Sequence, residues 1–127
     1  MSMDILATES HALKLCEKRA TLLASNIANS ATPQFKAIDF DFAAAFKHAN
    51  SLVSAIATTH AAHIPVAQHS PEAKIQYRVP MQFSSDENTV DDELERKSFS
   101  ENALMYQAGV NIAQNKIHAL LHALKGD

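Results

Sequence analysis

The sequence predicts a mainly α-helical protein in which long N- and C-terminal helices pair as an antiparallel coiled-coil hairpin. Apolar residues recur at heptad spacings near both ends of the chain, and all four prolines lie between these regions. Only two glycines occur among 127 residues, which argues against a turn-rich all-β fold. We expect one helical domain formed by residues 1–29 and 89–127, joined by a middle segment, residues 30–88.

The N-terminal helix is expected from about Met3 to Ile27. Its apolar residues follow spacings of seven, three, four, three and four, which is the a/d pattern of a heptad repeat. This seam consists of Leu6, Leu13, Cys16, Ala20, Leu23 and Ile27. A second stripe beside it consists of Ile5, Ala12, Leu15 and Leu22. The apolar face is therefore wider than a two-stranded coiled coil requires.

The C-terminal helix is expected from about Val90 to Lys125, roughly 50 Å at about 1.5 Å per residue. Its apolar seam alternates spacings of four and three without a break, and consists of Phe99, Ala103, Tyr106, Val110, Ala113, Ile117, Leu120 and Leu124. A second stripe runs at seven-residue intervals through Met105, Ile112 and Ala119. Apolar surface on two flanks of each helix is more than one partner can bury, so the sequence predicts a protein that associates.

Capping residues mark both ends of the C-terminal helix. Thr89 is expected as the N-cap, with Asp92 three residues later as in a capping box. The acidic residues that follow suit the positive end of the helix dipole. Gly126 is expected to end the helix at its C-terminus.

The N-terminal helix is expected to stop abruptly at two asparagines. Their side-chain amides can bond the last free carbonyl groups of the helix, and Asn29 tolerates the left-handed conformation. Pro33 prevents the helix from continuing and biases Thr32 toward extended geometry. Phe40 and Phe42 then follow as expected anchors against the helices or a neighbouring molecule.

The middle segment is expected to be extended or partly disordered. It contains prolines 33, 65, 71 and 80 and little periodicity. A short helix is plausible from about Phe40 to Thr58. Residues Lys74 to Val79 alternate and favour one short strand, and the segment is expected to hold at most two.

Charge and motifs exclude several classes of function. Eleven basic and fourteen acidic residues give a net charge of −3, with no clustered positive surface for nucleic acid. No glycine-rich phosphate loop and no nucleophile motif occur, so neither an enzyme nor a small-molecule substrate or cofactor is expected. Cys16 lies on the heptad seam and is interpreted as a buried small hydrophobe.

Seven histidines raise the alternative of a metal site. His118 and His122 lie four apart on one helix face, and His60, His63 and His69 are close in sequence. A stable zinc site needs three or four ligands in defined geometry, so surface or interface histidines are the favoured interpretation.

The stretch at the end of the N-terminal helix and just after it resembles the signature of bacterial flagellar axial proteins, the rod and hook family. That signature is an Asn-Ile-Ala-Asn segment followed by Thr-Pro, an aromatic residue and lysine. The matching residues here are Asn26, Ile27, Ala28, Asn29, Thr32, Pro33, Phe35 and Lys36.

A second stretch is similar to the B-type subunits of the proximal rod within that family. The first half of its motif is matched by Tyr77, Arg78, Pro80, Asn88, Thr89, Val90 and Asp91. The second half is matched by Glu95, Phe99, Asn102, Leu104 and Tyr106. Gln34 and Glu87 stand where the family usually has glycine, at turns where glycine would have supplied a positive φ.

The resemblance implies a structural subunit of the flagellar basal body, without catalysis or cofactor. Such a subunit leaves the cytoplasm through the flagellar type III export apparatus without a cleaved signal peptide, and assembles in the periplasm. It polymerises with itself and other rod subunits, joins the inner-membrane ring to the rod, and transmits torque. Interlocked heptad seams would carry this load.

One alternative from another class remains open: a helical-hairpin adaptor or secretion chaperone that binds a partner helix. An adaptor should be cooperatively folded and helical by itself. A rod subunit should be poorly folded as a free chain and ordered only in the polymer. Circular dichroism with thermal melting of the purified monomer distinguishes the two.

Overall fold

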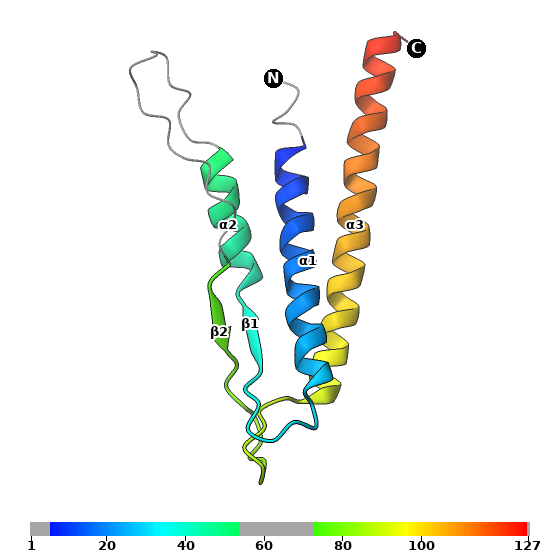
Figure 1. Cartoon of the computed structure of the whole chain (residues 1–127). Helices are drawn as coiled ribbons and strands as arrows, with labels where there is room; N and C mark the ends of the chain where they lie inside the picture. The colour runs from blue at the N-terminus through cyan, green and yellow to red at the C-terminus, as the bar shows by residue number, and fades with distance from the viewer. Residues whose placement is uncertain (1–5, 54–72, 127) are drawn as a thin grey trace, which may run out of the picture.

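The protein is mainly helical, as the sequence predicts (Figure 1). The structure is a computed structural model that describes residues 6–53 and 73–126. Its elements are α1 (Ala7–Ala28), β1 (Ile38–Phe40), α2 (Phe42–Val53), β2 (Ile75–Tyr77) and α3 (Asp92–Lys125). The expected start of the first helix at Met3 and the expected end of the short helix at Thr58 lie outside the described residues. The same holds for residues 54–72 of the middle segment, with their histidines. No described helix is both long and apolar enough to cross a membrane.

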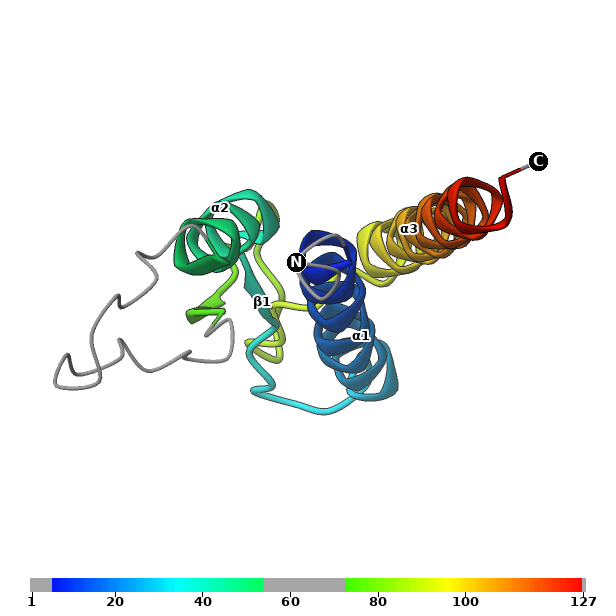
Figure 2. The same cartoon turned by 90° about the horizontal axis from the view of Figure 1, so that it is seen from above.

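The long helices α1 and α3 form the predicted antiparallel hairpin (Figure 1). The 22 residues of α1 span about 33 Å and the 34 residues of α3 about 51 Å, so α3 continues past the first turn of α1. Seen from above, α2 and α3 lie on opposite sides of α1 (Figure 2). Helix α1 is therefore the central element of the described fold.

The apolar core lies on the α2 side of α1. Phe40 stacks on Phe42 with ring centroids 6.4 Å apart, and Phe42 stacks on Phe46 at 6.2 Å. The buried members of the core are Leu15, Phe40, Ala45 and Ala73. The expectation that Phe40 and Phe42 are anchors against the helices is confirmed. Leu15 comes from the second stripe of α1, so that stripe serves the core and leaves the other flank for α3.

A two-stranded antiparallel ribbon connects this core to the base of the hairpin. Strand β1 pairs with β2 in a register that places Ile38 opposite Tyr77 and Phe40 opposite Ile75. The backbone N–H of Arg78 continues the ladder to the carbonyl of Ala37 at 2.9 Å. The strand predicted within Lys74 to Val79 is confirmed, and its partner is a strand that sequence periodicity did not predict.

Two turn residues replace glycine at positive φ. Gln34 has φ 62° and Glu87 has φ 60°, which are the only non-glycine residues in the left-handed region within the described chain. The inference that the missing glycines would have supplied a positive φ is thus confirmed. The left-handed conformation costs a side-chain-bearing residue roughly 1–2 kcal/mol. The turns keep their shape through hydrogen bonds, as Gln34 N donates to Asp86 O at 2.9 Å.

One predicted helix cap is wrong, and a second has another backbone conformation than expected. The N-cap of α3 is Asp91, whose side chain accepts from Leu94 N at 3.2 Å. Thr89 lies two residues before this cap, and its hydroxyl accepts from Ala37 N at 2.8 Å instead. The C-cap of α1 is Asn29 as expected, but its φ is −104°, and the left-handed residue is Gln34 instead. The amide of Asn29 does donate to a last-turn carbonyl, Ser25 O, at 2.8 Å. Gly126 ends α3 at φ 74°, as predicted.

Candidate functional site

Asn26 organises the base of the hairpin. Its side chain is fully buried: Nδ2 donates to the carbonyl of Ile38 at 2.8 Å and to Glu95 Oε2 at 3.2 Å, while Oδ1 accepts from Ile38 N at 3.1 Å. The amide thus pairs with the backbone of β1 on two sides and with a carboxylate of α3. A weak helix former is retained in the last turns of α1 because its hydrogen bonds join three elements, and a buried amide without partners would be costly.

Four charged side chains extend this contact into a chain of alternating sign. Arg19 on α1 donates to both carboxylate oxygens of Asp39, at 3.1 and 3.0 Å. Arg78, which follows β2, donates to Asp39 at 2.7 Å and also to Glu95 on α3. We call Arg19, Asn26, Asp39, Arg78 and Glu95 the polar junction. Its two acids and two arginines balance, and each element at the base contributes a member.

The two acids of the polar junction have pKa values displaced in opposite directions. Burial raises the pKa of Glu95, and the hydrogen bond from Asn26 and the charge of Arg78 offset this only in part. Burial also acts to raise the pKa of Asp39, but the hydrogen bonds from Arg19, the Phe40 amide and Arg78 outweigh it and leave that pKa lowered. Asp39 is therefore the firmly ionised acid, and Glu95 is the one that depends on its partners.

A second polar contact, centred on Asn88, holds the connection after α1. Its Nδ2 lies 3.0, 2.9 and 2.9 Å from the carbonyl oxygens of Asn29, Ser30 and Thr32, and its Oδ1 accepts from Val90 N at 2.8 Å. The two N–H hydrogens of this amide group thus serve three carbonyl oxygens at and after the end of α1, so at least one hydrogen is shared between two of them. These carbonyls would otherwise need water or lose hydrogen bonds.

Thr89 and Lys36 complete the contact between the two predicted motifs. Thr89 N donates to Phe35 O at 3.0 Å, its hydroxyl accepts from Ala37 N, and Lys36 Nζ donates to Glu87 O at 2.8 Å. The motif residues around 26–36 and 77–91 are therefore brought together, although about 50 residues separate them in the chain. Both motifs are visible in the sequence, but no pattern in it predicts that they touch.

Some motif residues do not take part in these contacts. Ala28, Pro33, Tyr77 and Pro80 are exposed, and Ile27 is half-buried. Conversely, Arg19 and Asp39 are members of the polar junction that sequence reasoning did not single out. No local signal marks them, because an exposed helical arginine and an acid between apolar residues are common in solvated positions.

The contact between α1 and α3 buries few apolar side chains and contains polar residues. Asn102 Nδ2 donates to Cys16 O at 2.8 Å, and Lys116 forms an ion pair with Glu9 near the other end. A Cβ added at Gly109 would lie 3.1 Å from Leu13 Cδ2, so the two helices approach closely there. The only fully buried residues of α3 are polar, Glu95 and Asn102. They lie seven residues apart, and this spacing is the signal that could have identified them.

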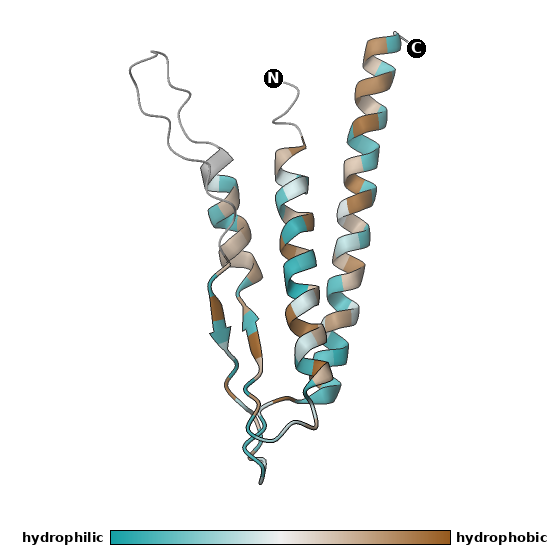
Figure 3. Ribbon diagram, viewed as in Figure 1, coloured by the Kyte–Doolittle hydropathy of each residue, from teal (hydrophilic) through white to brown (hydrophobic). Residues whose placement is uncertain are grey.

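The predicted heptad seams are only partly covered in the single chain. On α1, Cys16 and Leu23 are buried, and Leu6, Leu13, Ala20 and Ile27 are half-buried. On α3, Val110, Ala113 and Leu120 are half-buried, whereas Phe99, Ala103, Tyr106, Ile117 and Leu124 are exposed. Helix α1 thus covers one edge of the α3 seam and leaves the rest in solvent. Apolar residues recur along the whole of α3 (Figure 3).

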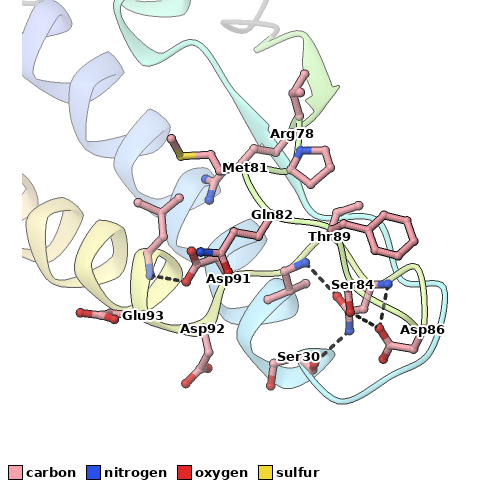
Figure 4. Close-up of a pocket in the computed structure, with 16 residues that line it drawn as sticks. Ser30, Arg78, Met81, Gln82, Ser84, Asp86, Thr89, Asp91, Asp92 and Glu93 are labelled. Atoms are coloured by element: carbon pink, nitrogen blue, oxygen red, sulfur yellow. Dashed lines mark hydrogen bonds between the residues drawn. The ribbon is translucent and has the colours of Figure 1, made fainter.

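A hollow of about 460 Å³ lies at the base, beside the start of α3 (Figure 4). Its lining includes the apolar residues Val79, Met81 and Phe83 and several acidic residues, among them Asp92 and Glu93. Within residues 6–53 and 73–126, no group of three or more histidine, cysteine or acidic side chains is arranged to hold a metal ion. The base is therefore a site of hydrogen bonds, ion pairs and apolar contacts.

Comparisons with known proteins agree with the resemblance seen in the sequence. No family model matches the chain. It is 39% identical to a protein of Cereibacter sphaeroides over 98% of this chain and 96% of the relative. It is 42% identical to one of Aeromonas hydrophila, over 92% and 89% of the two chains, and 39% identical to one of Escherichia coli K12, over 94% and 92%. Each relative is named flagellar basal body rod protein FlgB.

Proposed function

Because this chain belongs to the FlgB family of flagellar basal body rod proteins, and is thus a structural subunit of the rod, we propose that it polymerises through its terminal helices. In this proposal the subunit joins the inner-membrane ring to the rod and transmits torque for motility. It acts without catalysis, cofactor, nucleic acid or small-molecule substrate. It meets further copies of itself, other rod subunits, the ring, and the export apparatus at the base of the rod.

The observation that carries this proposal is the uncovered apolar surface of α3. Large apolar side chains remain exposed along its whole length: Phe99, Leu104, Met105, Tyr106, Ile112, Ile117, Leu121 and Leu124. Single exposed apolar residues are ordinary, but so many along one paired helix, on more than one of its faces, are typical of an interaction surface. Neighbouring subunits would bury it. The second stripe, with Met105 and Ile112, then faces a different neighbour from the seam residues Phe99 and Ile117.

The polar junction suits a subunit that carries mechanical load. Its charged members join α1, β1, the residue after β2 and α3 at one point, so the hairpin cannot slide without separating ion pairs inside the protein. Sliding would also unseat the side chains along the seam between the helices. The base thus fixes the relative positions of the two helices. In this proposal, residues 1–29 and 89–127 form the axial helical domain, and residues 30–88 extend from it.

The relatives place the chain in the basal body, and the finer location is part of the proposal. We propose that the subunit is exported through the flagellar type III apparatus without a cleaved signal peptide and assembles in the periplasm. The hairpin would then form in place, as apolar faces become buried against subunits already assembled.

Replacing Ile117 by aspartate tests the proposal. Ile117 is 43% exposed in the single chain, so the hairpin itself should tolerate Ile117→Asp. In the polymer the carboxylate would be buried against a neighbour at high cost, and we expect loss of rod assembly and of swimming. The measurements are motility in soft agar and electron microscopy of isolated basal bodies.

Asn111→Asp provides a matched control. Asn111 is exposed on the same helix, and the spacing of six residues places it on another face. This variant should swim like the wild type. Normal rods and swimming with Ile117→Asp, at unchanged protein level, would show that this face of α3 is not an assembly surface.

A further inference from the structure

Charge is segregated along the long axis of this protein. Residues 84–95, at the base, contain six acids and no basic residue. Residues 110–127, which include the far end of α3, contain Lys116, Lys125, His118 and His122 and a single acid, Asp127. The two regions lie at opposite ends of the hairpin (Figure 1). Such a charge distribution favours head-to-tail contacts over side-by-side contacts between parallel subunits.

Apolar side chains accompany the charges at both ends. At the base, Val79, Met81 and Phe83 alternate along an extended segment, and Met81 and Phe83 are 90% and 96% exposed. Lys116 of α3 pairs with Glu9, the third residue of α1, and α3 continues for nine residues beyond Lys116 at the far end. Leu124 is 84% exposed there, and Leu121 lies one turn earlier on the same helix. The base thus pairs apolar contact area with mainly acidic side chains, although Arg78 also lines it, and the far end pairs apolar contact area with lysine and histidine side chains.

The hollow at the base has an acidic lining and enough volume for the end of a helix. Its acidic residues are Asp86, Asp91, Asp92 and Glu93 (Figure 4). Asp86, Asp91 and Asp92 already make hydrogen bonds, whereas Glu93 is exposed and makes no ion pair within the described part of the chain. A cavity of about 150 Å³ holds a molecule the size of benzene. A hollow of about 460 Å³ therefore has room for two leucine side chains and the stem of a lysine.

We propose that this hollow binds the C-terminal end of the long helix of a neighbouring rod subunit, a helix end with the chemistry of this chain's own α3. The leucines of the incoming helix contact Met81 and Phe83, and its terminal lysine pairs with Glu93. Because the two contacting surfaces are different and lie at opposite ends of the hairpin, the contact is heterologous and joins successive subunits end to end. It therefore extends an assembly along an axis. This inference rests on the proposed function and adds an end-to-end contact to the lateral packing of α3.

A peptide with the sequence of residues 110–126 serves as the probe. We expect it to bind the full-length chain, as measured by fluorescence anisotropy of the labelled peptide, and more weakly as salt is raised. Met81→Ser in the full-length chain should weaken binding about tenfold, the effect of losing roughly 1.4 kcal/mol of contact. Tyr77→Ser is the matched control: Tyr77 is exposed on the same segment but does not line the hollow. Equal effects of the two substitutions, or no binding of the wild-type peptide, would overturn the proposal.

An exchange of charges tests the ionic half of the contact. Glu93→Lys in the full-length chain should weaken binding of the peptide, and Lys125→Glu in the peptide should restore it. Circular dichroism of the Glu93→Lys chain shows whether the fold is retained. A peptide with Lys125→Glu that binds the wild-type chain and the Glu93→Lys chain equally would remove Glu93 from the site.

A measurement in cells does not depend on the folding of the isolated chain. A photoreactive amino acid at Met81 should cross-link, in assembled basal bodies, to the last two turns of the C-terminal helix of a rod subunit. Cross-links confined to other parts of the partner, or none in swimming cells, would contradict the inference. If Ile117→Asp abolishes rods while this test fails, the proposed function stands and only the end-to-end contact is wrong.

Discussion

Removal of Arg78 should show how strongly the stability of the polar junction depends on one cation. Arg78→Ala leaves Asp39 with Arg19 but leaves Glu95, which is 0% exposed, with the amide of Asn26 alone. Removing one partner of a buried ion pair typically costs 3–5 kcal/mol. Asp39 and Arg78 both retain some contact with solvent, so we expect a value toward the lower end of this range.

Protonation of Glu95 sets an upper limit on the part of this cost that comes from the unpaired glutamate. A glutamate with an ordinary pKa of about 4.3 can be protonated at pH 7 for about 3.7 kcal/mol, and at pH 5 for about 1 kcal/mol. The destabilisation by Arg78→Ala should therefore be about 2–4 kcal/mol at pH 7 and about 1 kcal/mol at pH 5. The sign follows from linkage. A carboxyl whose pKa is raised in the folded state holds its proton more tightly there, so stability falls as pH rises from the unfolded-state pKa through the folded-state pKa.

Urea denaturation of the free chain, followed by circular dichroism at both pH values, measures this effect. If the free chain is too weakly folded, trimethylamine N-oxide shifts the equilibrium toward the folded state. Adding Glu95→Gln to Arg78→Ala should recover most of the loss at pH 7, because a neutral amide can still accept from Asn26. Equal destabilisation at pH 5 and pH 7, or no recovery in the double variant, would refute the reasoning.

Three further predictions concern the turns, the helix seam and the buried thiol. Gln34→Gly and Glu87→Gly should each stabilise the chain by about 1 kcal/mol in urea denaturation, because both residues have positive φ. Ser85→Gly, at a position without positive φ, should not stabilise the chain. A loss of stability in the first two variants would show that these positions are not strained. Gly109→Ala should change stability by less than about 1 kcal/mol, since the gain in helix propensity offsets the displacement of the end of Leu13, whereas Gly109→Val should be clearly destabilising by the same assay. Burial raises the pKa of the Cys16 thiol, so alkylation by iodoacetamide near pH 8 should be much slower in the folded chain than in urea, and equal rates in both would show an open seam.

Local patterns predicted the helices of this protein well. The alternating spacings of three and four along 99–124 indicate a long helix, and α3 spans Asp92–Lys125. Gly126 as the end of this helix and the positive φ of Gln34 and Glu87 also followed from residue type and family position. These features depend on backbone preferences and on neighbours a few residues away, which a sequence displays directly.

The polar junction could not be predicted in the same way. Asn26 and Glu95 are 69 residues apart, and each by itself fits an exposed helical position. The prediction of Thr89 as the N-cap of α3 was wrong for a related reason. The hydroxyl of Thr89 accepts a hydrogen bond from Ala37 N, 52 residues away, and Asp91 caps the helix. Hydrogen-bond partners at such separations depend on how the elements pack. The sequence therefore indicated which residues belong to the two motifs but not which atoms meet.

By itself, the sequence determined two long amphipathic helices, a proline-rich connection between them, the family, and an excess of apolar surface that calls for neighbours. Only the tertiary structure decided which flank α1 covers, that the core lies on the α2 side, and that the two most buried positions of α3 are a glutamate and an asparagine. Periodicity reports that a face is apolar but not which neighbour buries it. Burial of a charge is possible only where another part of the chain supplies the opposite charge, as Arg78 does for Glu95.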